Sequence, residues 1–261
     1  MSAHRAPARG PAATPSSGPP AVWSTAPSAG TSAVPSVAEL AFELPGSGHA
    51  LFTTRVAGNL STTAGDGHRH GLQRRAQLCQ QLNLRWLCSS AQVHGTAVNV
   101  IQRFAGHGGT PAPLQADAHA TQLPELGAMV LAADCLPVAL GCHGAVAVVH
   151  AGWRGLAAGV IEQAVATLRR LAGGREIAAI VGPGAGVCCY EVGEEVHAAF
   201  AGAHRHGRHI DLRAIAHERL AAAGVGEVRH VRACTICDER FFSHRREGAR
   251  AGRQAAVAWL S

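Results

Sequence analysis

Two short apolar segments, residues 128–133 and 145–149, constrain the fold of this chain more than any other part of its sequence. Both are rich in small or β-branched side chains and are bounded by polar residues or glycine, a pattern typical of buried strands rather than helices. The first segment leads into Asp134 and Cys135, and the second leads into His150. If the two strands lie side by side, a thiol and an imidazole meet at neighbouring strand ends. Such a pair can bind a metal ion or form a nucleophile with its base.

The hydrophobic pattern predicts an α+β fold, with mixed β-sheets and flanking helices in one domain that spans residues 38–261. Strands and helices follow one another without strict alternation, which argues against a doubly wound parallel sheet. Residues 117–121 are interpreted as a polar segment before the next strand. The pattern also predicts strands at 41–44, 50–54, 97–101, 177–181, 228–233, 241–246 and 255–260. It predicts helices at 71–84, 156–171, 191–200 and 212–223, with Asp211 as the N-cap of the last one.

Residues 1–37 differ in composition from the rest of the chain, because they are mostly Ala, Pro, Ser, Gly and Thr. Such a segment buries too little surface to offset its ordering entropy, so we predict a disordered tail, with a transit peptide as the alternative. We find neither the apolar core of a secretory signal peptide nor an apolar stretch of about 18 residues, so no membrane span is expected. We therefore expect a cytoplasmic protein whose eight cysteines are thiols or metal ligands.

The net charge of +6 and the isoelectric point near 9.2 raise the question of a nucleic-acid partner. The basic residues are scattered along the chain and are not interleaved with aromatic residues, which make up only 4% of it. This distribution argues against a nucleic-acid interface. It favours a basic pocket for an anionic or phosphate-bearing ligand.

Three residues, His94, Cys135 and His150, form the candidate site. Each is predicted to follow a strand, and each is flanked by small residues that leave room for a ligand. Two imidazoles and a thiolate with an open fourth position match the ligand set of a catalytic zinc ion, although their spacing follows no zinc-finger rule. The same residues allow Cys135 to act as a nucleophile with His150 or His94 as its base and Asp134 as the group that orients the imidazole.

Two glycine-rich turns are candidates for anion binding. Residues 152–155 and 182–186 are each predicted to follow a strand and precede a helix, where backbone N–H groups can hold an anion. Tight turns that require glycine are the alternative. Candidate cations for a phosphate are Arg55, Arg154, Arg245 and Arg246.

A second cysteine set consists of Cys188, Cys189, Cys234 and Cys237. Four thiolates suit a structural zinc ion, but a vicinal pair predicts poor geometry around one metal. We therefore expect no metal at these four residues.

Several motifs occur in one order along the chain. They are QVHG at 92–95, DAHAT at 117–121, DCLPV at 134–138, HAGWRG at 150–155, CCYEV at 188–192, CT at 234–235, FFSHRR at 241–246 and GRQ at 252–254. This succession resembles the YfiH/YlmD family of laccase-domain proteins, which has a human relative called FAMIN. The resemblance extends over about residues 52–260.

The resemblance implies a single-domain fold like that of the cytotoxic necrotizing factor catalytic domain. It also implies a metal, usually zinc with copper as the alternative, held by His94, Cys135 and His150. Family members are described as purine nucleoside phosphorylases that act on adenosine, inosine, guanosine and methylthioadenosine, with adenosine deaminase activity. Older descriptions name copper-dependent polyphenol oxidases, and one branch is described as a peptidoglycan-editing factor. A copper-dependent, laccase-like polyphenol oxidase and a Cys-dependent amidase in peptidoglycan-precursor editing are therefore the alternative functions.

The expected roles and partners follow from this resemblance and the chemistry above. A monomer is expected to bind a purine nucleoside and phosphate, without a nucleic-acid or membrane partner. The loop at 56–66 is shorter than is usual in the family, and His244 replaces the usual Tyr, so substrate choice or activity is expected to differ. Catalytic roles are expected for Cys135, His150 and Arg55, and substrate or phosphate binding for Arg55, Asp117, Trp153, Arg154 and Arg245.

Overall fold

The computed structural model describes residues 40–103 and 115–261, which lie in one compact unit. Residues 1–37, for which we predicted disorder, lie outside the described residues. The strands are β1 Ala41–Leu44, β2 Gly48–Phe52, β3 Trp86–Cys88, β4 Val98–Ile101, β5 Ala118–Thr121, β6 Leu126–Ala132, β7 Leu136–Cys142, β8 Ala145–Ala151, β9 Ala178–Val181, β10 Arg205–His206, β11 His209–Ile210, β12 Glu227–His230 and β13 Gln254–Leu260. The helices are α1 Gly67–Gln81, α2 Trp153–Ala158, α3 Val160–Ala172, α4 Glu194–Ala199, α5 Leu212–Ala222 and α6 His244–Glu247.

Two mixed sheets form the centre of the fold, which confirms the predicted α+β class. A six-stranded sheet has the order β12-β9-β7-β8-β5-β4, and a five-stranded sheet has the order β1-β2-β13-β6-β3. Most neighbouring strands are antiparallel, while the β12–β9, β4–β5 and β3–β6 pairs are parallel. Strands β10 and β11 form a separate small hairpin.

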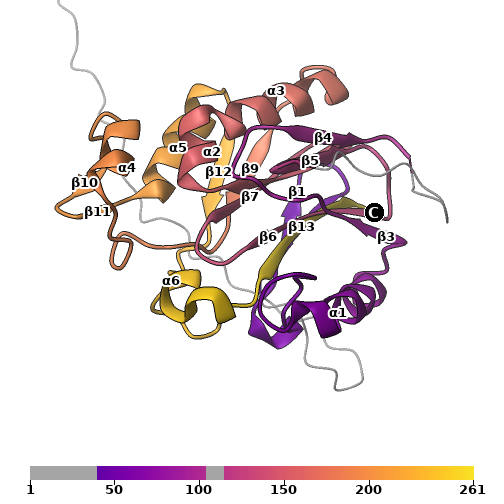
Figure 1. Cartoon of the computed structure of the whole chain (residues 1–261). Coiled ribbons are helices and arrows are strands. Elements are labelled where there is room, and N and C mark those ends of the chain that lie inside the picture. The colour runs from indigo at the N-terminus through magenta and orange to yellow at the C-terminus, as the bar shows by residue number, and fades with distance from the viewer. Residues whose placement is uncertain (1–39, 104–114) are drawn as a thin grey trace, which may run out of the picture. The chain divides into compact units, whose positions relative to one another are not determined.

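The sheets stack on each other between layers of helices (Figure 1). Helices α3 and α5 pack side by side on the outer face of the six-stranded sheet, and α1 lies against β3 on the other side of the molecule. Both faces of the six-stranded sheet are covered because side chains along a strand such as β8 alternate between two hydrophobic cores. Ala147 and Val149 face the helices, whereas Val146 and Val148 face the five-stranded sheet. Among the described residues, no helix is long and apolar enough to cross a bilayer.

Many local predictions are confirmed, including the first two strands, which pair antiparallel as β1 and β2. The Asp211 cap is also confirmed, because its carboxylate accepts hydrogen bonds from the N–H groups of Arg213 and Ala214. Helix α1 begins at Gly67, four residues before the predicted start at residue 71. The helix predicted at 156–171 is interrupted, because Gly159 has a left-handed conformation that ends α2 before α3 begins.

Three predictions around the site are wrong. Residues 118–121 form the fully buried strand β5 rather than a polar loop, because Asn99 and backbone groups of neighbouring segments satisfy its polar side chains. Residues 244–247 form helix α6 rather than a strand, and the Ser243 hydroxyl caps it. The turn at 182–186 follows β9 but does not precede a helix, since the next helix begins at Glu194.

Candidate metal centre and substrate cavity

Cys135 and His150 meet through a strand that the sequence did not predict. We expected them at neighbouring ends of β6 and β8, but these strands belong to different sheets. Strand β7 pairs antiparallel with β8 in a register that places Pro137 opposite His150 and Leu136 opposite Ala151. Cys135 directly precedes β7, so the pairing brings it beside the carboxyl end of β8.

His94 lies in a bend between β3 and β4, not at a strand end, and has a φ of 60°. A buried carboxylate fixes this bend, since Asp117 accepts hydrogen bonds of 2.8–3.0 Å from the N–H groups of residues 93–95. The Gln92 amide exchanges two hydrogen bonds of 2.7 Å with the backbone of Leu131 in β6. His94 therefore has a fixed backbone despite its position in a loop.

Asp117 also orients His150, a role for which the sequence suggested Asp134. The Asp117 Oδ1 atom lies 2.8 Å from Nδ1 of His150, and both side chains are buried. Burial raises the pKa of Asp117, but its hydrogen bonds with His150 and with the loop N–H groups outweigh this and lower the pKa. The Asp134 carboxylate instead accepts 2.7 Å hydrogen bonds from the Thr235 hydroxyl and the Arg245 N–H.

The three predicted ligands converge in space. One ligand atom from each of His94, Cys135 and His150 lies within 4.8 Å of the others. The Cys135 sulfur is 3.8 Å from Nε2 of His94, and the two imidazole rings have centroids 4.9 Å apart. Gly152 keeps this space open, because a Cβ there would lie 2.7 Å from Cδ2 of His94 and 3.0 Å from the Cys135 sulfur.

The thiol and the neighbouring imidazole shift one another's ionisation. Burial raises the pKa of Cys135, but the charge of His150 and contacts with both imidazoles lower it to about 6. Burial lowers the pKa of His150, but the Cys135 thiolate and the hydrogen bond to Asp117 raise it to about 9. Cys135 is therefore a thiolate at neutral pH, the form that binds metals and attacks electrophiles.

The three side chains line a cavity of about 810 Å³, a size typical of small-molecule sites. The cavity is lined by residues 61–64, 89–92 and 131–133, and by Arg75, His94, Cys135, His150, His244 and Arg253. The loop at 56–66 therefore contributes residues 61–64 to the wall. His244, where the resemblance led us to expect Tyr, also lines the cavity.

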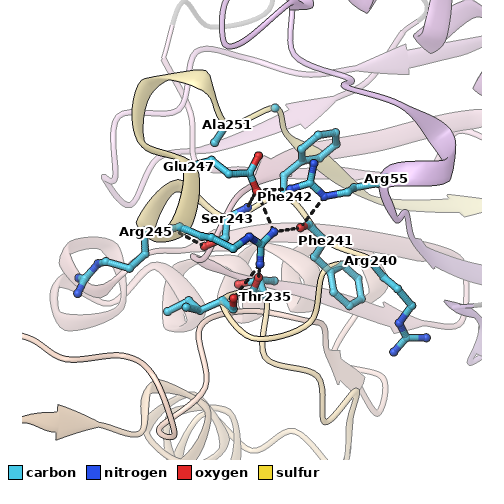
Figure 2. A network of polar contacts seen from close by, with 12 residues as sticks. Arg55, Thr235, Arg240, Phe241, Phe242, Ser243, Arg245, Glu247 and Ala251 are labelled. Atoms are coloured by element: carbon cyan, nitrogen blue, oxygen red, sulfur yellow. Dashed lines mark hydrogen bonds and ion pairs between the residues drawn. The ribbon is translucent and has the colours of Figure 1, made fainter.

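The predicted phosphate-binding residues lie outside the lining of this cavity. Arg55 pairs with Glu247, donates to the Phe241 carbonyl and stacks over Phe242 (Figure 2). Arg154 stacks over Trp153, which packs against the core. Arg245 donates to the Glu191 carbonyl and lies over Tyr190, and Asp117 is buried behind His150.

Two arginines that the sequence did not single out line the cavity instead. Arg75 on α1 donates to the Leu60 carbonyl and the Ser89 hydroxyl, and Arg253 donates to the carbonyls of residues 251–252. Within residues 40–103 and 115–261, neither guanidinium forms an ion pair with a carboxylate. Burial lowers the pKa of both arginines. The GRQ motif at 252–254 was the signal in the sequence, but it gave Arg253 no role.

This site and fold agree with the comparisons to known proteins. Residues 50–261 match the family described as multi-copper polyphenol oxidoreductase laccase. The chain belongs to this laccase-domain family, also called the YfiH family. A purine nucleoside phosphorylase of Xylella fastidiosa is 39% identical over 236 residues, which cover 83% of this chain and 88% of that protein. The purine nucleoside phosphorylase YfiH of Escherichia coli is 36% identical over 239 residues, which cover 81% and 93%.

Solved structures of this YfiH family share the fold. A protein of Neisseria meningitidis has a TM-score of 0.71 and 33% identity, covering 83% of this chain and 96% of that one. YlmD of Geobacillus stearothermophilus has a TM-score of 0.72 and 26% identity, covering 82% and 92%. The resemblance stated from the motifs is therefore confirmed.

Replacing Asp117 with Asn is expected to weaken binding of a metal ion at this site, measured with zinc, about 10- to 100-fold, because an amide cannot accept from His150 and all three loop N–H groups. The unfolding free energy should fall by about 2 kcal/mol, since an N–H group is left unsatisfied. Chelator competition measures the affinity, and thermal unfolding measures the stability. Asp211→Asn is the matched control, because it weakens only the cap of α5. Equal zinc affinities in Asp117→Asn and the wild type would contradict the role of Asp117.

His119 is expected to make stability fall in mild acid. Its ring is buried, its Nε2 accepts the Ser90 N–H, and burial lowers its pKa to about 4. Because the unfolded pKa is near 6.5, the unfolded chain takes up the proton first as pH drops. Between pH 6.5 and 4, the free energy of unfolding should fall by about 3 kcal/mol more in the wild type than in His119→Gln. Urea unfolding across this range checks the difference, and parallel pH profiles for the two chains would rule it out.

Proposed function

We propose that this chain is a zinc-dependent purine nucleoside phosphorylase that acts on adenosine, inosine, guanosine or methylthioadenosine. The observation that carries the proposal is one cavity lined by both a metal-ligand set and two arginines that have no carboxylate partner among the described residues. Relatives that this chain matches over most of their length are named purine nucleoside phosphorylases, which supports the same reaction.

The donor atoms fit a zinc ion. His94, Cys135 and His150 offer two nitrogens and a thiolate, and catalytic zinc sites keep three protein ligands and one open position. The hydrogen bond from His150 to Asp117 is the usual support for a zinc-bound imidazole, because it fixes the ring and raises its basicity. Bound zinc would supply a positive charge that polarises an oxygen or nitrogen of the ligand. Copper fits the same donors and is the alternative ion.

Phosphorolysis joins a phosphate oxygen to C1′ of the sugar and breaks the bond from C1′ to the purine nitrogen. The protein must hold the phosphate beside the sugar and balance its charge. Arg75 and Arg253 suit this task. Both are partly buried and pair with no carboxylate in the part of the chain that the structure describes, which leaves a desolvation penalty that a bound anion offsets. The hydroxyl side chains of residues 61–63 line the same cavity and can bind the sugar or phosphate.

The test is phosphate-dependent release of the purine base. The zinc-loaded chain is incubated with inosine or adenosine, with and without phosphate, and with and without a chelator. Free base and ribose 1-phosphate are expected only when both zinc and phosphate are present. Free base with plain ribose would indicate a hydrolase, and inosine formed from adenosine would indicate the deaminase activity. No base release with zinc bound and phosphate present would refute the proposal.

A Cys-dependent amidase is the second candidate, because Cys135, His150 and Asp117 also have the connectivity of a nucleophile–base–acid triad. The position of His94 favours a metal site over a catalytic triad. Its Nε2 lies 3.8 Å from the Cys135 sulfur, and a triad needs no second imidazole there. Inhibition experiments distinguish the amidase from the zinc-dependent phosphorylase. An amidase would resist the chelator and lose activity on alkylation by iodoacetamide, whereas zinc bound at Cys135 should slow that alkylation.

A further inference from the structure

Four cysteines outside the cavity converge from two loops. Cys188 and Cys189 lie in the turn after β9, and Cys234 and Cys237 lie in the loop after β12. Each sulfur is within 4.8 Å of the other three, and all four residues are free thiols. The sequence predicted poor geometry here because of the vicinal pair, but the structure brings all four sulfurs together.

The backbone conformation explains why the vicinal pair converges. Residues 187–189 form a turn in which the N–H groups of Cys189 and Tyr190 both donate to the Gly186 carbonyl. In an extended strand, adjacent side chains point to opposite faces, but a helical turn separates them by only about 100°. Both sulfurs can therefore face the opposite loop.

Two sulfur separations in the cluster are close to those of a tetrahedral zinc site. Zinc–sulfur bonds are about 2.3 Å long, so the corners of a ZnS₄ tetrahedron lie about 3.8 Å apart. The Cys188 sulfur is 3.8 Å from the Cys237 sulfur and 3.5 Å from the Cys189 sulfur. Cys234 and Cys237 also have the Cys-x-x-Cys spacing that places two thiolates on one metal.

Backbone hydrogen-bond donors surround the Cys234 sulfur, one of the four in the cluster. The Gly186 N–H donates to the Cys234 sulfur at 3.2 Å, and backbone N–H groups of the 236–237 turn point to the same atom. Arg246 donates to the carbonyls of Thr235 and Ile236, and Arg213 donates to the Ala233 carbonyl. Two guanidinium groups therefore contact the loop that contains Cys234 and Cys237. Their positive charge is favourable near a zinc ion with four thiolate ligands, which has a net charge of −2.

We propose that Cys188, Cys189, Cys234 and Cys237 bind one structural zinc ion. All four positions of the metal are filled by protein, as in sites that hold loops together rather than perform chemistry. The ion fastens the Cys188–Cys189 turn to the Cys234 loop. Thr235 in that loop donates to Asp134, the neighbour of Cys135, so the ion also stabilises the approach to the cavity.

Metal content of purified full-length chains tests the proposal. Chains purified under reducing conditions are loaded with zinc, dialysed and measured by mass spectrometry of the elements. With both clusters filled, we expect two zinc ions in the wild type, one in Cys237→Ser, one in Cys135→Ala and none in the double variant. Cys79→Ser is the control, because Cys79 belongs to neither cluster. Cys237→His should keep the ion, since imidazole is also a zinc ligand.

Cobalt identifies the donors directly. In the Cys135→Ala background, bound Co²⁺ should give the intense visible and sulfur charge-transfer bands of a tetrahedral thiolate site. Cys237→Ser should remove these bands while its circular dichroism stays that of the wild type. A Cys135→Ala chain that binds neither zinc nor cobalt would overturn the proposal, as would a disulfide among the four cysteines in the reduced, zinc-loaded protein. A wild type with one zinc, lost only in Cys237→Ser, would support this site while removing the metal from the proposed function.

Discussion

Replacing Cys135 with alanine is expected to lower kcat/KM for phosphorolysis on the order of 1,000-fold, which corresponds to about 4 kcal/mol. The substitution removes the thiolate between His94 and His150, and two imidazoles alone hold zinc poorly. Steady-state kinetics with inosine and phosphate, together with zinc content, measure the effect. The fold should persist, because the half-buried side chain is not part of any of the three hydrophobic core clusters.

Cys79→Ala provides the matched control for this experiment. Cys79 is also a half-buried free thiol, but it lies on α1 outside both cysteine clusters. Its replacement should leave kcat/KM and zinc content close to those of the wild type. If Cys135→Ala retains full phosphorolysis, the reaction occurs elsewhere in the chain. If it loses base release but still binds a zinc ion at His94 and His150, Cys135 acts as a nucleophile rather than as a ligand.

Replacing Gly152 with alanine is expected to lower zinc affinity and kcat/KM at least about 100-fold, although only one methyl group is added. That methyl would lie 2.7 Å from the His94 ring and 3.0 Å from the Cys135 sulfur, so both ligands must move. The backbone itself accepts alanine, because Gly152 has an extended conformation with φ −68°. The effect is therefore steric, and overpacking should lower the unfolding free energy by about 1–3 kcal/mol.

Gly95→Ala is the matched control, since Gly95 follows His94 in the same bend. A Cβ there would meet its nearest neighbours, Val93 and Asp117, at ordinary contact distances of 3.5 and 3.6 Å. Activity should change little, and the unfolding free energy should stay within about 0.5 kcal/mol of the wild type. Equal losses in Gly152→Ala and Gly95→Ala would show general damage to the loop rather than obstruction of the ligand site. Zinc titration and thermal unfolding of both variants make the comparison.

Local sequence patterns determined most of the secondary structure. Short apolar segments at residues 145–149 and 255–260 identified β8 and β13, and the helical pattern at 212–223 with Asp211 before it identified α5. These signals succeed because period and capping depend on neighbours within a few residues. Strand β5 was missed for the converse reason. Its His119 and Thr121 are polar, and only partners from distant segments allow them to be buried.

The three candidate ligands were also identified from the sequence, through residue chemistry and then the family motifs. How they meet was not, because it depends on the register between β7 and β8 and on the bend that Asp117 holds. The arginines of the cavity show the same limit. Arg55 has the charge expected of a phosphate ligand, but it forms an ion pair with Glu247. Arg75 and Arg253 line the cavity instead.

The sequence by itself determined the fold class, the family and the residue types available for metal chemistry. Only the tertiary structure decided which side chains share a site. It placed Asp117 rather than Asp134 behind His150, and it joined Cys188–Cys189 to Cys234 and Cys237. The physical reason is that propensity and capping are local, whereas contacts between distant segments follow from strand pairing and from the backbone conformation of the connecting loops.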